Sequence, residues 1–417
     1  MKKKMKLSKI YYWILPALVM FSIASCHKDN SLGFTPGTGA PVITSVSKIS
    51  NSVVDSSRTS SVITYDASGN PTTVTSPNYN AQVVGLDSAT VTGTLSGYYV
   101  MNGSNLGSTS NIAINGVSIY FNRALSSDKS LVFTIPTTIP YVQPQANTIV
   151  VTTLHGTATY KFTTLPPPPT ITAVSDYDFQ AGTQITLTGK GFASVSAIKL
   201  KATGDACTIV SHNDSTLVMT MPTNSTATES NLLFTYTSGT NTNAQAISGA
   251  VFNNLDNAYL IFADSKFQNS WGDNSWQAPS GVSTGASHSG SSSIVATYPS
   301  NGWKIEGWAN WYPSFPYDAS YKYLTFWVKG GKADHTLTLV GDKIAGGYGQ
   351  NTSPAAIQQI DVPPGVWTFY KIPLGTGANQ LNYWATGSPA QQLGFFLKGQ
   401  STDPDETMYF DEVAFLK

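Results

Sequence analysis

Tryptophan is the residue type in this chain whose placement most strongly indicates recognition chemistry. Nine Trp occur among 417 residues, and all of them except Trp13 lie beyond residue 270. Structural need alone would spread tryptophan more evenly along a chain of this length. We therefore expect the C-terminal part of the protein to use large flat aromatic rings for a purpose besides core packing.

Several of these tryptophans stand among turn-forming residues, where no strand packing explains them. An exposed aromatic patch usually marks a binding surface. Trp303 can face either the core or a ligand, whereas Trp327 and Trp367 lie in apolar runs typical of buried strands. The predicted binding residues are Trp271, Trp276, Trp303, Trp308, Trp311, Tyr312, Glu306 and Trp384.

The chemistry of flat indoles beside Asn, Asp, Gln and Lys suits carbohydrate. A pyranose ring has an apolar face of C–H groups and a rim of hydroxyls. An indole that stacks on this face removes apolar area from water at roughly 25 cal/mol per Å², while the polar side chains can hydrogen-bond the rim. The sequence predicts binding of a neutral polysaccharide or oligosaccharide.

The charge balance fits a neutral ligand. Only 11% of the residues are charged, with 23 basic and 23 acidic residues. Five of the basic residues fall in residues 1–25, so a chain that begins at Cys26 has 392 residues, 18 of them basic and 23 acidic. A mildly acidic surface repels polyanions, and nucleic acid is not an expected partner.

A glycosidase would need two carboxylates that face each other across a cleft. Glu306, among the tryptophans, is the best catalytic candidate, but a ligand-bonding role fits it better. The sequence has no His-Glu-x-x-His or phosphate-loop motif. We therefore predict no enzymatic activity and no required cofactor.

Residues 1–25 have the pattern of a secretory signal. Five lysines precede the apolar run Tyr11–Ile23, which is shorter than the roughly 20 residues of a membrane-spanning helix. Small residues then lead to Cys26, which resembles a bacterial lipobox, where the cysteine carries lipid; a plain signal peptide is the alternative. The following Lys28-Asp29 resembles a surface-export signal of Bacteroidota lipoproteins. The predicted location is the outer membrane, with the chain lipid-anchored and facing outward.

Two segments of the chain repeat each other across a proline run. Residues 26–40 are rich in Ser, Gly, Thr and Pro and predict a tether, and 166–169 are four prolines that predict a stiff spacer. Pro41-Val42-Ile43-Thr44 matches Pro169-Thr170-Ile171-Thr172, and Gly103 matches Gly189. We call residues 41–165 the first repeat, with an insertion between about 48 and 97, and residues 170–253 the second repeat. Alternating β-branched runs in both predict all-β, immunoglobulin-like sandwiches.

Both repeats resemble the IPT/TIG immunoglobulin-like family, the second more closely than the first. The remaining residues, 257–417, are here called the C-terminal sandwich. They resemble the glycan-binding domain of Bacteroidota surface glycan-binding proteins, including those for xyloglucan and other β-glucans, and jelly-roll carbohydrate-binding domains generally. The matching stretches are Ile261–Asp264, Gln268–Trp271, Ser287–Ile294, Leu324–Gly331, Pro364–Trp367 and Met408–Val413.

The resemblance implies further features. Aromatics on the C-terminal sandwich would bind glycan, and the repeats would be spacers. A TonB-dependent importer and a companion binding lipoprotein would be partners. Related sandwiches hold a structural calcium, for which Asp264 and Asp411 are the candidate ligands. A surface adhesin for a protein or host glycan, and a jelly-roll glycoside hydrolase or polysaccharide lyase, are the alternatives.

Overall fold

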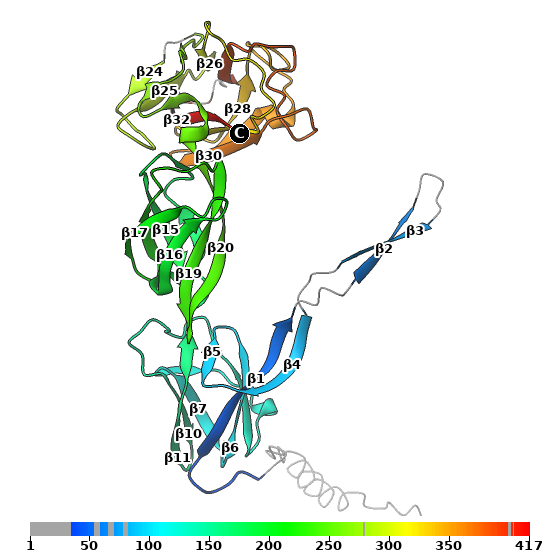
Figure 1. The fold of residues 1–417 in the computed structure, drawn as a ribbon, viewed down its shortest axis with the longest axis vertical. Helices are drawn as coiled ribbons and strands as arrows, with labels where there is room; N and C mark the ends of the chain where they lie inside the picture. Colours follow the sequence, from blue (N-terminus) through cyan, green and yellow to red (C-terminus); the bar gives the residue numbers. More distant parts are fainter. Residues whose placement is uncertain are drawn as a thin grey trace, which may run out of the picture. The chain divides into compact units, whose positions relative to one another are not determined.

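The computed structural model describes residues 35–417 apart from 54–58, 66–70, 78–81, 278–279, 399–401 and 403. Cys26 and most of the predicted tether lie outside the described residues. The regular secondary structure of the described chain is nearly all β-strand (Figure 1). Its contacts divide it into two compact units, Met1–Pro167 and Pro168–Lys417, and the division falls within the proline run. In the described part of the chain, no helix is long and apolar enough to cross a membrane.

The first repeat is a β-sandwich. One sheet has the strand order β4-β1-β6-β9 and the other the order β11-β10-β7-β8, while β5 pairs with β12. Alternate residues point into the shared core, such as Tyr99 and Met101 from one sheet and Ile149 and Val151 from the other. The elements are β1 (Val42–Val53), β2 (Thr59–Tyr65), β3 (Pro71–Pro77), β4 (Gln82–Ala89), β5 (Thr92–Thr94), β6 (Tyr98–Ser104), β7 (Thr109–Ile114), β8 (Val117–Ile119), η2 (Arg123–Leu125), β9 (Ser130–Thr134), β10 (Thr148–Thr153), β11 (Gly156–Lys161) and β12 (Thr163–Leu165).

The insertion of the first repeat forms strands of its own. The end of β1 pairs with β4, and between them β2 and β3 form a separate two-stranded ribbon. The ribbon is visible in blue in Figure 1. The inserted residues thus extend one edge of the sandwich and leave its core unchanged.

The second repeat has the strand order β13-β15-β18-β17-β16-β19-β20-β14. Its first pairing repeats that of the first repeat: Ile171 lies opposite Gly189 as Ile43 lies opposite Gly103, with a bulge directly after each. At either glycine, a Cβ would collide with the facing backbone carbonyl, which explains the shared glycine. The elements are β13 (Thr170–Val174), β14 (Asp178–Phe179), β15 (Gln184–Lys190), η3 (Phe192–Ser194), β16 (Val195–Leu200), β17 (Ala206–His212), β18 (Thr216–Thr220), β19 (Glu229–Ser238) and β20 (Asn241–Asn254).

The C-terminal sandwich encloses its core between a seven-stranded and a five-stranded sheet. The first contains β22-β21-β32-β25-β24 with β27 and β30, and the second has the order β23-β26-β31-β28-β29. Phe326 and Phe410 from one sheet meet Phe395 from the other. The elements are η4 (Leu255–Asn257), β21 (Tyr259–Ala263), β22 (Lys266–Phe267), β23 (Gly272–Asp273), β24 (Gly281–Ser283), β25 (Ser293–Tyr298), β26 (Trp303–Ala309), β27 (Tyr323–Lys329), β28 (His335–Val340), η5 (Ala356–Gln358), β29 (Gln359–Val362), β30 (Trp367–Pro373), β31 (Gln392–Lys398) and β32 (Glu406–Leu416).

Candidate functional site

Strand β26 presents different side chains on the two faces of the five-stranded sheet. Trp308 lies in the main core of the sandwich, whereas Ile305 belongs to a separate small cluster with Val340 and Phe396. Successive side chains of a strand point to opposite faces. Trp303 and Ile305 therefore lie on the outer face of the sheet, and Trp308 lies on the inner face.

An aromatic cluster lies on this outer face, and we call Trp276, Trp303, Tyr348 and Phe396 the sheet-face cluster. The ring centroid of Trp276 lies 6.5 Å from that of Trp303 and 5.1 Å from that of Tyr348. Trp303 lies 6.5 Å from Phe396, which is buried beneath it. Trp276 is 41% exposed, and Trp303 and Tyr348 are half-buried. The cluster thus offers indole and phenol surface to solvent above a small apolar base.

The segment that carries Trp276 is held to the sheet by backbone hydrogen bonds. Asn274 N donates to Gly307 O at 2.8 Å, and Trp276 N donates to Ile305 O at 3.0 Å. The segment therefore continues the pairing of β23 along the edge of β26, and Trp276 stands on a fixed backbone. The turn-forming residues around Trp276 predict a loop, whereas the structure pairs Trp276 with Ile305 of β26.

Tyr348 is part of the cluster because two glycines leave room for it. Gly307 and Gly394 lie opposite each other on β26 and β31. A Cβ at Gly307 would collide with the Tyr348 hydroxyl, and a Cβ at Gly394 would collide with Ile305 and lie only 3.0 Å from the Tyr348 ring. The hydroxyl donates to Asn274 O at 2.6 Å, which fixes the ring over the glycine pair. The composition of the sequence gave no reason to select Tyr348, and the signal was the Gly-Gly pairing, which only strand register reveals.

Polar side chains frame the sheet-face cluster. Lys398 lies opposite Trp303 and is exposed, Thr338 lies opposite Phe396, and Gln359 lies opposite Thr338. Directly paired residues of an antiparallel sheet share a face. Thr338 is buried, whereas the exposed ammonium of Lys398 and amide of Gln359 stand on the same surface as the aromatic rings, where they can hydrogen-bond the hydroxyls of a stacked sugar.

A second set of exposed aromatics, here called the loop group, consists of Trp311, Tyr312, Tyr317 and Trp384. The first three are 59%, 88% and 61% exposed. Trp384 is half-buried, contacts Tyr317 edge-on at 5.4 Å and donates from Nε1 to Phe315 O. Trp311 is eight positions after Trp303, and most of the segment between them is strand β26. At the rise of a strand this spacing puts the two residues roughly 25 Å apart. The predicted tryptophans thus belong to two groups.

The prediction that Trp308 and Trp271 bind the ligand is wrong, because both side chains are buried. Trp308 has no exposed surface and packs against Phe395 and Phe410. Trp271 is also buried in the core, with its Nε1 donating to Tyr259 Oη at 3.2 Å. A ring enclosed by core side chains presents no face to a sugar, so both tryptophans stabilise the sandwich.

Glu306 is likewise not at the surface, and the prediction that it bonds the ligand is wrong. Its Oε1 accepts the Trp308 indole N–H at 3.0 Å, and its Oε2 accepts the hydroxyls of Ser275 and Ser280. The Lys304 ammonium, also buried, lies 3.7 Å away. Burial raises the pKa of Glu306 to about 7. This group therefore forms an internal polar network behind the sheet.

The structure also bears on the calcium candidates. Asp411 accepts backbone N–H groups from His288, Ser289 and Glu412. Asp264 accepts the side-chain amide of Gln180. Calcium usually takes six to eight oxygen ligands; Asp411 already accepts three protein donors, whereas Asp264 is exposed and accepts one. The pair thus fits a hydrogen-bonding role better than calcium coordination, and the calcium site stays a prediction.

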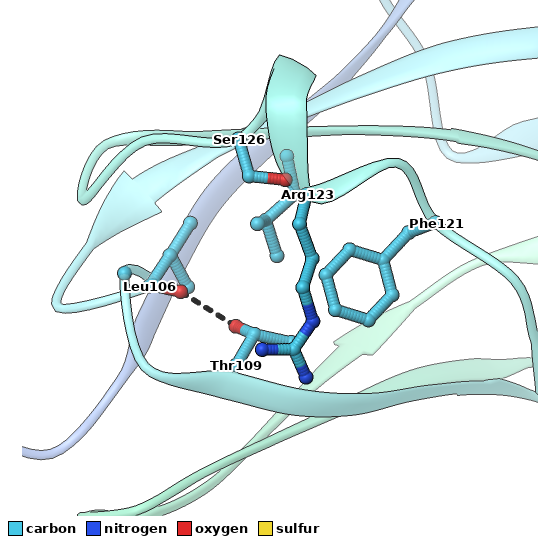
Figure 2. Close-up of a pocket in the computed structure, with 7 residues that line it drawn as sticks. Leu106, Thr109, Phe121, Arg123 and Ser126 are labelled. Carbon is cyan, nitrogen blue, oxygen red and sulfur yellow. Dashed lines mark hydrogen bonds between the residues drawn. The ribbon is translucent and has the colours of Figure 1, made fainter. Parts of the chain in front are cut away.

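The first repeat contains a hollow that is too small to bind a sugar. It is lined by residues that include Leu106, Thr109, Phe121 and Arg123 (Figure 2), and its volume of about 10 Å³ is room for about one water molecule. Thr109 Oγ1 donates to Leu106 O at 2.6 Å, and the Arg123 guanidinium lies 5.8 Å from the Phe121 ring. These contacts close the hollow and leave no space for a sugar.

Comparison with known sequences assigns the second repeat to a domain family. Residues 169–248 match the IPT/TIG domain family, which confirms that resemblance. An IPT/TIG domain-containing protein of Bacteroides ovatus is 33% identical over 105 residues, or 24% of this chain. The chain covers 22% of that relative's length.

Solved structures to which this chain is similar include surface glycan-binding proteins. One is PbSGBP-B of Prevotella bryantii, with 16% identity, coverage of 92% of this chain and 99% of that chain, and a TM-score of 0.47. Another is SGBP-B from a complex xyloglucan utilization locus in Bacteroides uniformis, with 16% identity, coverage of 78% and 96%, and a TM-score of 0.39. A Family 11 carbohydrate-binding module of Clostridium thermocellum covers 38% of this chain and 95% of its own, at 13% identity and a TM-score of 0.25.

Proposed function

We propose that the protein binds a neutral β-linked polysaccharide without chemical turnover and that the sheet-face cluster is its platform. The observation that carries the proposal is the exposed indole of Trp276 beside Trp303 and Tyr348, on a sheet face that also presents Lys398 and Gln359. Rings fixed by strand pairing lose little conformational entropy on binding, which favours affinity. Glu306, the best catalytic candidate of the sequence, is enclosed in the protein and does not face a ligand. Its burial supports a protein that binds glycan without hydrolysing it.

The test is affinity electrophoresis and calorimetry with a panel of xyloglucan, mixed-linkage glucan, mannan and xylan. The panel starts from β-glucans because two of the similar surface glycan-binding proteins are named for a xyloglucan utilization locus and for a mixed-linkage glucan utilization locus. We expect saturable binding of at least one β-glucan and no release of reducing ends. Binding to none of the four polysaccharides would refute the proposed function.

Two variants locate the platform. One face of an indole is roughly a third of the 150–250 Å² that a tryptophan can bury, which at about 25 cal/mol per Å² corresponds to about 1.5 kcal/mol, or tenfold in affinity. We therefore expect Trp276→Ala and Trp303→Ala each to weaken binding about tenfold. Trp311→Ala, from the loop group, is the matched control and should leave affinity unchanged. The opposite pattern would keep the glycan and move the platform to the loop group.

The location of the protein is a second part of the proposal, and its support is the sequence. Cys26 after a short apolar run would carry lipid and anchor the chain in the outer membrane, where it would present glycan to an importer and a companion binding lipoprotein. Cys26→Ser should abolish incorporation of labelled fatty acid and move the protein out of the membrane fraction. Unchanged labelling of the variant would contradict the anchor.

A further inference from the structure

The second repeat and the C-terminal sandwich, which belong to one compact unit, meet along a seam that buries both aromatic and charged groups. Tyr177 stacks on Phe369 with ring centroids 5.3 Å apart and lies 6.2 Å from Trp327. Lys371 Nζ donates to Glu229 Oε2 at 2.6 Å and to Asn253 Oδ1 at 2.8 Å. The seam is therefore a packed interface with directional bonds.

The imidazole of His288 lies at the centre of this seam between carboxylates from both sides. Its Nδ1 is 2.9 Å from Glu412 Oε2 and 3.8 Å from Asp176 Oδ2. One ligand atom from each of the three residues lies within 4.8 Å of the others. Asp176 belongs to the second repeat, whereas His288 and Glu412 belong to the C-terminal sandwich. The side chains of His288, Asp176 and Glu412 are 8%, 12% and 7% exposed to solvent.

The aromatic surroundings fix the orientation of the ring. His288 stacks on Trp327 with centroids 3.7 Å apart and planes 15° apart, and Trp367 lies edge-on at 5.6 Å. A ring orientation that is fixed by neighbouring side chains favours metal binding by a histidine.

Carboxylates outnumber cations in the seam. Asp178 has no exposed surface; its Oδ1 accepts the Asn253 amide, but its Oδ2 is buried without a hydrogen-bond partner. The charges of Glu412 and Asp178 act on each other and on Asp176. Burial raises the pKa of Asp176 to about 9 and that of Glu412 to about 8. A buried carboxylate needs a cation or a proton to offset its lost hydration.

We propose that Asp176, His288 and Glu412 bind a divalent transition-metal ion of the zinc class. The donor set of one imidazole nitrogen and carboxylate oxygens suits zinc, whereas calcium prefers oxygen alone. The distances from His288 Nδ1 to the two carboxylate oxygens, 2.9 Å and 3.8 Å, lie on either side of the roughly 3.3 Å that separates the ligands of a tetrahedral zinc ion with bonds of about 2 Å. Because the ligands come from both sides of the seam, the ion would fix the C-terminal sandwich to the second repeat. This site is distinct from the predicted calcium pair Asp264 and Asp411.

The test uses the full mature chain, purified with a tag that contains no histidine. Metal analysis after dialysis against micromolar Zn²⁺ should give about one equivalent of zinc. Cobalt(II) in place of zinc should give visible absorption bands of a nitrogen- and oxygen-ligated ion. EDTA should lower the melting temperature by several degrees, and Zn²⁺ should restore it more effectively than Ca²⁺.

The variants separate this site from adventitious binding. His288→Gln and Asp176→Asn should each lower zinc affinity at least tenfold, while His155→Gln, which changes an exposed histidine of the first repeat, should retain one equivalent. Asp176→Asn preserves side-chain volume and provides a second readout if His288→Gln does not fold. The proposal is overturned by less than a tenth of an equivalent of zinc in the wild type, by equal zinc in His288→Gln, or by a melting temperature that responds to pH or Ca²⁺ but not to EDTA and Zn²⁺.

Discussion

At the scale of single residues, the buried pair of Glu306 and Lys304 makes stability depend on pH. Burial raises the pKa of Glu306 from 4.5 to about 7, so the folded chain binds the proton more tightly than the unfolded chain does. Stability from this group is fully present below about pH 4.5 and is lost as the pH rises through about 7. The difference corresponds to up to about 3 kcal/mol.

Glu306→Gln should therefore remove this part of the pH dependence. The amide does not ionise, so the free energy of unfolding of the variant, measured by urea titration between pH 4 and 8, should fall less steeply than that of the wild type. Asp334→Asn changes an exposed carboxylate that does not act on Glu306 and serves as the control. Parallel curves for the wild type and Glu306→Gln would contradict the buried acid.

Residue type alone did not select the individual residues of the sheet-face cluster. Trp276 and Trp303 lie together as expected of a platform, but Trp308 does not join them. The reason is the two-residue period of a strand, because Trp303 and Trp308 are an odd number of positions apart and so point to opposite faces. The sequence would have shown this only if β26 had been recognised as one continuous strand. Phe396 and Tyr348 come from distant segments and depend on sheet register.

At the scale of elements, the glycine pair on β26 and β31 is the feature that shapes the platform. Gly307→Ala would place a methyl group against the Tyr348 hydroxyl, and Tyr348 would have to leave its position beside Trp276. We expect glycan affinity to fall at least fivefold, with a stability loss of about 1–3 kcal/mol from overpacking. Calorimetry with the bound glucan and thermal melting provide the two measurements.

Gly349→Ala is the matched control for this substitution. A Cβ at Gly349 has no atom within 4 Å, although the residue is adjacent to Tyr348 in sequence. It should therefore keep wild-type affinity. If Gly307→Ala also binds normally, Tyr348 has no role in recognition and the platform consists of the two tryptophans.

The strands of the repeats were the most predictable elements. The aligned segments around Ile43 and Ile171 predicted equivalent first strands, and both pair with a glycine strand in the same register. The all-β class follows from the same alternation. The pairing of 274–276 with the edge of β26 was not predictable, because turn-forming residues such as Gly272 and Asn274 indicate a loop when hydrogen-bond partners are unknown.

At the scale of the whole molecule, the asparagine-rich junction 253–257 is held by hydrogen bonds and packing contacts and is not a free linker. Asn253 donates to Asp178 and accepts from Lys371, and Asn254 donates to Ser225 O. Leu255 is buried against Ala414 and Leu416. Asn is common in turns because its side chain bonds nearby backbone, so composition predicts a boundary here, whereas the long-range partners that pack the junction are not visible in the sequence.

This packing predicts how the protein can be divided. Cutting before Pro168 follows the division between the two compact units, so residues 168–417 should fold alone, melt in a single transition and bind glycan as tightly as the full chain. Cutting before residue 257 would expose Trp327, Phe369 and the carboxyl of Glu412, all of which the second repeat covers. We expect residues 257–417 to melt at least 5 °C lower or to aggregate, as measured by calorimetry and light scattering. Equal melting temperatures for the two fragments would show that the seam contributes no stability and that the second repeat is an independent spacer.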